Sequence, residues 1–145
     1  MSTTTGSIKE IVTYLNFDGR CEEAIEFYKK TLGAQVEFMM RFKDNPEPPP
    51  PGQFSPGVEN KIMHASLRIG NTPLMASDGR CTGKAAFQGS TLAIRVPTEG
   101  DADRVFAALA DGGKVTMPLE KTFFSPRFGM LTDRFGVGWM VLVQH

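Results

Sequence analysis

The chain has 145 residues, of which 41% are hydrophobic and 22% charged, a composition typical of a soluble globular protein. Sixteen Lys and Arg residues balance sixteen Asp and Glu residues, which argues against a nucleic-acid binder or a polybasic membrane anchor. The sequence contains no apolar run of about 18 residues and no apolar secretory signal. Its two cysteines, Cys21 and Cys81, form no CxxC pattern, so we expect no disulfide scaffold. We also expect the protein to be cytoplasmic.

The first half of the chain predicts a strand, a helix and three further strands. Asp18-Gly19 supplies a turn and a candidate N-cap for the helix. Acidic residues begin this helix, Lys29 and Lys30 lie near its end, and Gly33 is a stop signal. The expected segments are a strand at 11–17, a helix at 21–33, and strands at 34–42, 61–70 and 72–79.

A proline-rich loop at 44–57 interrupts this half and holds six of the ten prolines. Proline fixes φ and lacks a backbone N–H, so the segment cannot lie in a central strand or a helix. A mobile insertion is the favoured interpretation. The alternatives are a lid over a pocket and an arm that reaches a partner subunit.

The second half of the chain repeats the same order of elements. A shift of 79 positions superposes Phe27 on Phe106 and Gly33 on Gly112, which indicates an internal duplication of a βαβββ unit. The expected segments are a strand at 90–98, a helix at 100–114 that ends at Gly112-Gly113, and strands at 114–125, 127–136 and 137–144.

Three stretches of sequence carry a family resemblance: YLNFDGRCEEAIEFYKKTLGA, MHASLRIGNTPLMASD and GGKVTMPLEKTFFSPRFGMLTDRFGVGWM. Together they resemble the PhnB-like branch of the glyoxalase/bleomycin-resistance superfamily, also called vicinal oxygen chelate proteins. The resemblance implies an α+β fold in one domain over 1–145. Two βαβββ modules, at about 9–80 and 88–145, would form a curved, barrel-like sheet around a cavity. It also implies a homodimer.

Enzymes of this superfamily typically hold a divalent metal ion with His and Glu ligands on the first and last strands of each module. The matching positions here are Thr13, Met75, Thr91 or Leu92, and Met140. Hydroxyl and thioether groups are poor ligands for hard divalent cations. We therefore expect no metal and no other cofactor. The alternative is a metal-dependent lyase, isomerase or dioxygenase that uses His64 with nonstandard carboxylate ligands.

His64 is the best candidate for a catalytic group, as a general base or a hydrogen-bond donor. The alternative is a partly buried histidine that bonds a backbone carbonyl. Arg41 and Arg95 are candidates for binding an anionic group, although the alternation around Arg95 is also typical of a solvent-exposed strand face. The predicted ligand contacts are Thr13, Tyr14, Asn16, Arg41, His64, Ser66, Met75, Arg95, Phe123 and Trp139.

The leading hypothesis is a metal-free, homodimeric protein that binds a small organic molecule in its cavity. A third hypothesis is a partner-binding protein that uses the proline-rich loop. Both cysteines are predicted to be structural. Cys21 opens a helix, but the adjacent Glu22 and Glu23 oppose formation of a thiolate.

Overall fold

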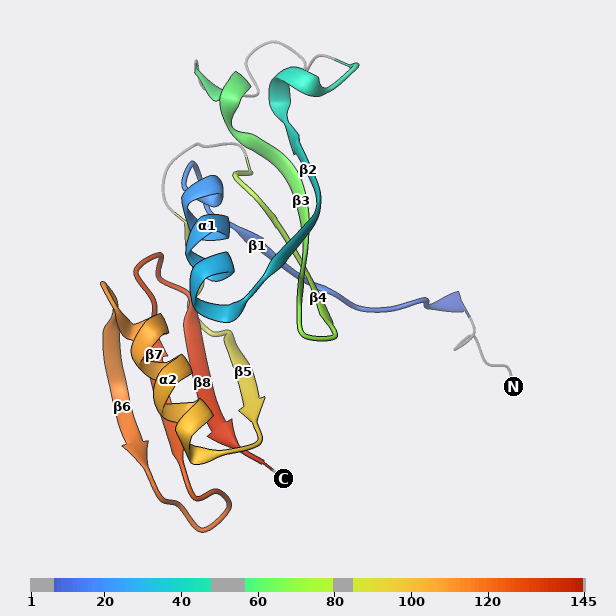
Figure 1. The fold of residues 1–145 in the computed structure, drawn as a ribbon. Coiled ribbons are helices and arrows are strands. Elements are labelled where there is room, and N and C mark those ends of the chain that lie inside the picture. The colour runs from blue at the N-terminus through green and yellow to red at the C-terminus, as the bar shows by residue number, and fades with distance from the viewer. Residues whose placement is uncertain (1–6, 48–56, 80–84, 145) are drawn as a thin grey trace. The chain divides into compact units, whose positions relative to one another are not determined.

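A computed structural model describes residues 7–47, 57–79 and 85–144 and contains two βαβββ arrangements in series (Figure 1). Neither of its two α-helices is long and apolar enough to cross a membrane. The first arrangement consists of β1 (Thr13–Asn16), α1 (Cys21–Leu32), β2 (Gln35–Arg41), β3 (Ile62–Ile69) and β4 (Thr72–Ser77), with 3-10 turns at Phe42–Asp44 and Val58–Asn60. The second consists of β5 (Thr91–Val96), α2 (Glu99–Ala110), β6 (Lys114–Glu120), β7 (Phe128–Thr132) and β8 (Gly138–Val143). The expected α+β class and order of elements are confirmed.

The strands form two four-stranded sheets of the same topology. Their strand orders are β1-β4-β3-β2 and β5-β8-β7-β6. In each sheet the first strand runs parallel to the last, and the other pairs are antiparallel. Because a parallel pair cannot be joined by a tight hairpin, the helix provides the connection away from the first strand. Both sheets are open, with β1 and β2 at the edges of one and β5 and β6 at the edges of the other.

Contacts divide the described chain into two units. The first holds the residues up to Glu26 and from Gly33 to Gly79, and the second holds Phe27–Leu32 together with the residues from Ala85 onward. The second half of α1 is therefore grouped with β5–β8. Most of the proline-rich loop at 44–57 lies outside the described residues, as does Cys81.

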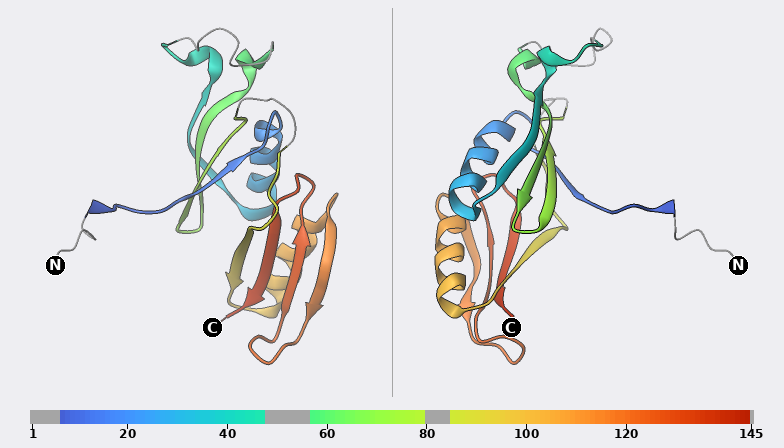
Figure 2. Two further views of the ribbon diagram at one scale, coloured as in Figure 1. Left: turned by 180° about the vertical axis from the view of Figure 1, so that it is seen from behind. Right: turned by 45° about the vertical axis from the view of Figure 1, so that its right-hand side comes forward.

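Alternation along the strands gives each sheet one buried side. In the first unit Leu15, Leu67 and Leu74 are buried, while their neighbours along the strands are half-buried or exposed. In the second unit α2 packs along the equivalent side of its sheet, most closely on β7 and β8 (Figure 2). This period of two leaves the opposite side of each sheet available for other contacts.

The start of α1 depends on a residue that sequence analysis did not identify. Asp18 is the only described non-glycine residue with a positive φ, at 51°. The carboxylate that accepts hydrogen bonds from the backbone at the helix N-terminus belongs to Asp78. Its Oδ1 accepts hydrogen bonds from the backbone N–H groups of Gly19 at 2.8 Å and Cys21 at 2.7 Å. Its Oδ2 accepts a third from Ile62 at 2.8 Å. Asp78 therefore joins the helix N-terminus to β3 and satisfies backbone donors that would otherwise be buried without partners.

Candidate functional site

Several of the predicted ligand contacts lie on one side of the sheet β1–β4. Strand register places Tyr14 beside Met75, Met75 beside Ser66, and Ser66 beside Phe38, so these four residues form a row across all four strands. His64 lies two residues before Ser66 on β3, and therefore on the same side. We call these five side chains the open face; Tyr14 is 44% exposed and Phe38 is 47% exposed.

His64 is the chemical centre of the open face. Its Nδ1 lies 3.2 Å from the hydroxyl of Tyr14, and its Nε2 lies 3.4 Å from the hydroxyl of Ser66. The rings of Tyr14 and Phe38 flank the imidazole, with centroids 5.7 and 6.0 Å away. A hydroxyl can donate or accept, so both tautomers of a neutral imidazole are satisfied in this arrangement. The half-buried ring can therefore exchange hydrogen bonds with a ligand.

Three other predicted contacts of the first unit have different surroundings. Asn16 accepts a hydrogen bond from the hydroxyl of Ser77 at 2.7 Å. Arg41 forms two hydrogen bonds with Glu22, at 2.9 and 2.7 Å, and this bonding lowers the pKa of the Glu22 carboxyl. The Arg41 charge is thus already paired. Thr13 lies opposite the buried Leu74, on the side of β1 that alternates away from Tyr14.

The three predicted contacts of the second unit do not converge on one point. Arg95 is exposed and donates a hydrogen bond to Gln144 at 3.3 Å. The Phe123 side chain is completely exposed. Trp139 is 3% exposed and lies on the buried side of β8, where its indole N–H donates to Asp133 at 2.8 Å. Their roles as ligand contacts remain predictions.

The buried carboxylate of Asp133 organises the core around Trp139. Its Oδ1 accepts hydrogen bonds from the backbone N–H groups of Phe135 and Val137, at 2.9 and 3.1 Å. Its Oδ2 accepts from the hydroxyl of Tyr28 as well as from Trp139. Nothing in the local sequence indicates this cluster, because Tyr28 and Asp133 are 105 positions apart.

The residues predicted to match the superfamily's metal positions are Thr13, Met75, Thr91 or Leu92, and Met140. Register puts Tyr14, rather than Thr13, beside Met75, and Ala93, rather than Thr91 or Leu92, beside Met140. The described residues contain no group of three or more His, Cys, Asp or Glu side chains that could hold a metal ion. The hydroxyl and thioether groups at the predicted positions are not the carboxylate, imidazole or carbonyl ligands that a hard divalent cation prefers.

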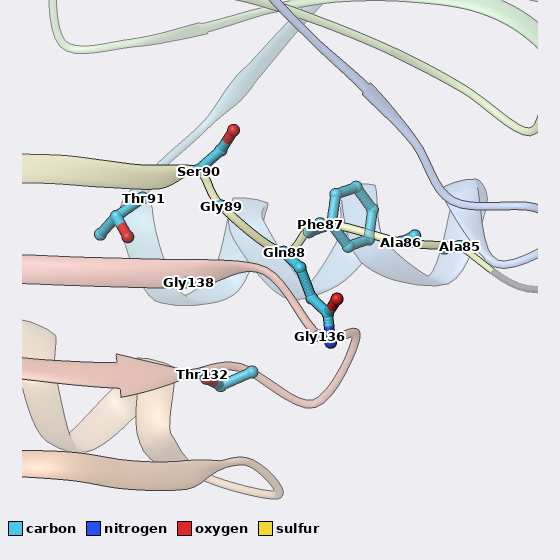
Figure 3. A pocket seen from close by; sticks show the side chains of 10 residues that line it. All are labelled: Ala85, Ala86, Phe87, Gln88, Gly89, Ser90, Thr91, Thr132, Gly136 and Gly138. Carbon is cyan, nitrogen blue, oxygen red and sulfur yellow. The ribbon is translucent and has the colours of Figure 1, made fainter.

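The second unit contains a cavity that sequence analysis did not predict. Its volume is about 610 Å³, and the segment before β5 forms one side while the ends of β7 and β8 form the other (Figure 3). Among the described residues, the polar side chains that line it carry hydroxyl and amide groups, and none of these lining side chains is charged. The lining residues are Ala85, Ala86, Phe87, Gln88, Gly89, Ser90, Thr91, Thr132, Gly136 and Gly138.

Similarity to known proteins establishes the family. Residues 10–141 match the family model of the Glyoxalase/Bleomycin resistance protein/Dioxygenase superfamily. Protein YjdN from Escherichia coli strain K12 is 37% identical over 137 residues, which cover 90% of this chain and 92% of YjdN.

Two solved structures extend this similarity to the fold. The crystal structure of protein PA1353 from Pseudomonas aeruginosa is 43% identical, with a TM-score of 0.81 and coverage of 94% of this chain and 98% of that one. The PhnB protein from Bacillus cereus is 29% identical, with a TM-score of 0.78 and coverage of 94% and 100%. The chain therefore belongs to the Glyoxalase/Bleomycin resistance protein/Dioxygenase superfamily, in its PhnB-like branch.

Proposed function

We propose that this protein binds a small organic molecule on the open face, with His64, Tyr14 and Ser66 as its polar contacts. The observation that carries the proposal is the position of the imidazole, which lies half-buried between two hydroxyl groups. Ligand sites commonly combine apolar walls with a few convergent polar groups. Here Phe38 and Met75 supply apolar surface in the same cross-strand row.

The chemistry of the open face favours a flat ligand that carries oxygen atoms. The exposed rings of Tyr14 and Phe38 can stack on a planar molecule. His64 and the two hydroxyls can both donate and accept hydrogen bonds, so they suit hydroxyl or carbonyl groups. Arg41 does not contribute a free positive charge, because Glu22 neutralises it.

We further propose that this binding requires no metal ion. The polar neighbours of His64 are hydroxyls, and the neighbouring strand contributes the thioether of Met75. This set lacks the carboxylate and imidazole ligands that Zn²⁺ and Mn²⁺ select. A metal-dependent lyase, isomerase or dioxygenase is the alternative that the experiment below must distinguish.

The presence of only two histidines makes a direct binding experiment practical. Proton NMR should show two imidazole Hε1 signals, from His64 and His145, which His64→Gln assigns. Catechol, a flat ring with adjacent hydroxyls, is the probe. We expect the His64 signal to shift and saturate with catechol, while the His145 signal stays in place. The absence of any saturable shift for catechol would contradict the proposed site.

Matched variants test which groups make the contacts. Ser66→Ala and Tyr14→Phe should each weaken catechol binding about two- to tenfold, the effect of one hydrogen bond. Thr13→Val changes the adjacent residue on the other side of β1 and should leave the affinity unchanged. Addition of Zn²⁺ should not shift the His64 signal, and addition of Mn²⁺ should not broaden it selectively. A stoichiometric shift with Zn²⁺, or selective broadening by Mn²⁺, would favour the metal-dependent enzyme.

A further inference from the structure

The cavity of the second unit is separate from the open face. Its lining residues fall between Ala85 and Gly138, within the unit that holds β5–β8, and none of them belongs to the open face. Its volume of about 610 Å³ lies in the usual range of sites for small molecules, about 300–1,000 Å³. The cavity is therefore a candidate for a second site with a ligand of its own.

A gap between two threonine side chains, which we call the notch, crosses three strands at this cavity. Strand register places Thr91 of β5 beside Gly138 of β8, and Gly138 beside Thr132 of β7. Residues that pair directly across strands share a side of the sheet. Thr91 and Thr132 therefore stand on one side, on strands about 10 Å apart, with no side chain between them (Figure 3).

The backbone conformation at Gly138 does not require glycine. Its φ is not positive, in contrast to the φ of 94° at Gly136 in the preceding turn. Glycine in a strand costs stability, because it loses more conformational freedom on folding than alanine does. An added Cβ atom would lie 3.3 Å from the backbone oxygen of Ser90 and 3.5 Å from the hydroxyl of Thr91, so it would occupy the notch. The missing side chain at Gly138 therefore keeps the notch open.

The polar groups of the cavity are available to a ligand. Four lining side chains have no hydrogen-bond partner among the described residues: Gln88, Ser90, Thr91 and Thr132. Figure 3 shows the Gln88 side chain extending toward Gly136. Its amide offers a donor and an acceptor side by side, and each hydroxyl can act in either role.

This combination of groups fits one chemical class of ligand. A glutamine amide forms two hydrogen bonds with the amino group and the neighbouring ring nitrogen of adenine. Phe87 lines the same cavity and supplies an aromatic surface for a base. Threonine hydroxyls suit the hydroxyls of a ribose. We propose that the cavity binds an uncharged purine nucleoside, with its base on Gln88 and its ribose between Thr91 and Thr132.

Amide NMR spectra of the full chain test where adenosine binds. Adenosine should shift the backbone signals of Gly89, Gly136 and Gly138 in a saturable manner, and it should leave the signals of Tyr14 and Ser66 in place. Because the cavity shares no residue with the open face, the affinity for adenosine should be the same in His64→Gln. The absence of a saturable shift in the three glycine signals, or a shift confined to the open face, would overturn the proposal.

Two related ligands test the chemical class. Purine riboside lacks the amino group of adenosine and should bind about two- to tenfold more weakly, the effect of one hydrogen bond. Adenosine monophosphate should bind no tighter than adenosine, since the described lining side chains are uncharged and Lys114, opposite Thr132 on β6, is not among them. Equal binding of purine riboside, or tighter binding of the monophosphate, would overturn the proposed class.

Variants of the cavity test the contacts themselves. Gln88→Met removes the amide at an exposed position and should abolish the preference for adenosine over purine riboside. Gly138→Ala places a methyl group in the notch and should weaken adenosine binding about tenfold. Gly100→Ala, outside the cavity, is its control and should bind adenosine like the wild type. Circular dichroism verifies that each variant is folded. A preference that persists in Gln88→Met, or wild-type affinity in folded Gly138→Ala, would contradict the proposed contacts.

Discussion

Asp133 shows how one buried carboxylate can determine a core. It is 3% exposed, and its two oxygens accept hydrogen bonds from two backbone N–H groups, a phenol and an indole. These donors come from α1, from β8 and from the turn between β7 and β8. Because all of them are buried, loss of the acceptor leaves several groups without partners, which costs more than the hydrogen bonds themselves contribute.

Asp133→Asn should therefore lower the free energy of unfolding by about 3–5 kcal/mol. The N–H₂ group of the asparagine would replace one carboxylate oxygen and would face hydrogen-bond donors where the oxygen accepted from them. Urea denaturation followed by circular dichroism measures the change. Asp111→Asn is the matched control, because that side chain is 78% exposed, and its effect should stay within about 0.5 kcal/mol. Equal effects for the two variants would show that the Asp133 cluster does not stabilise the fold.

Cys21 has a potentially nucleophilic side chain that its surroundings make unreactive. The residue is fully buried, and burial raises the pKa of its thiol, with further increases from the nearby Asp78 and Glu22 carboxylates. A thiol reacts through its thiolate, so its position at a helix N-terminus does not activate it. This agrees with the structural role predicted for Cys21.

In a Cys81→Ser variant, Cys21 should react with a thiol reagent such as 5,5′-dithiobis(2-nitrobenzoate) only after unfolding in guanidinium chloride. The unfolded sample provides the control and should give one thiol for each chain. Rapid labelling of the native variant at neutral pH would mean that the helix start opens, or that the thiol is more acidic than its burial implies.

Close approach between elements depends on glycine at one turn in particular. A Cβ atom added at Gly113 would lie 2.2 Å from the backbone oxygen of Thr132, so β6 can begin beside β7 only without a side chain there. Gly100, in the first turn of α2, has no such neighbour, because the nearest atom to an added Cβ is 4.0 Å away. Gly100 and Gly113 are the same residue type, but only Gly113 lies too close to another backbone segment to carry a Cβ atom.

Gly113→Ala should therefore destabilise the protein by about 1–3 kcal/mol, the usual cost of inserting an atom into a packed region. Gly100→Ala should stabilise it by about 0.5 kcal/mol, because alanine loses less conformational freedom in a helix. Thermal unfolding of both variants provides the comparison. A neutral result for Gly113→Ala would mean that β6 and β7 can separate locally without cost.

The complete chain is not a simple series of two independent halves. Tyr28 has no exposed surface and packs edge-on against Phe135 and Trp139, with ring centroids 6.2 and 5.6 Å away. This aromatic residue lies in the first half of the chain but belongs to the unit that holds β5–β8. A fragment that begins at residue 84 would therefore lack part of its own core.

We expect a fragment of residues 84–145 to unfold with low cooperativity in circular dichroism measurements. A peptide of residues 20–33 should restore a cooperative transition by supplying the phenol that bonds Asp133. The same peptide with Tyr28→Ala should restore much less. If the fragment alone unfolded as cooperatively as the complete chain, the second half of α1 would not be needed for that core.

The order of elements could be predicted because hydrophobic periodicity, caps and turn residues act over a few neighbouring positions. The helix at Cys21–Leu32 and the hairpin at Gly70-Asn71 have such local signals. The family resemblance rests on residues that are read directly from the sequence, and residues 10–141 match the family model. Sequence also showed that Arg95 alternates with apolar neighbours, and the structure places it on an exposed side of β5.

Contacts between distant positions could not be predicted in this way, because they depend on register and burial in the folded chain. Asp78 starts a helix 57 positions before it, and Asp133 joins Tyr28 to Trp139. A strand's periodicity shows that its sides differ, but packing decides which side is buried and which strand lies alongside. For this reason the fold placed Tyr14 beside Met75 and His64 beside Tyr14, and put Trp139 in the core.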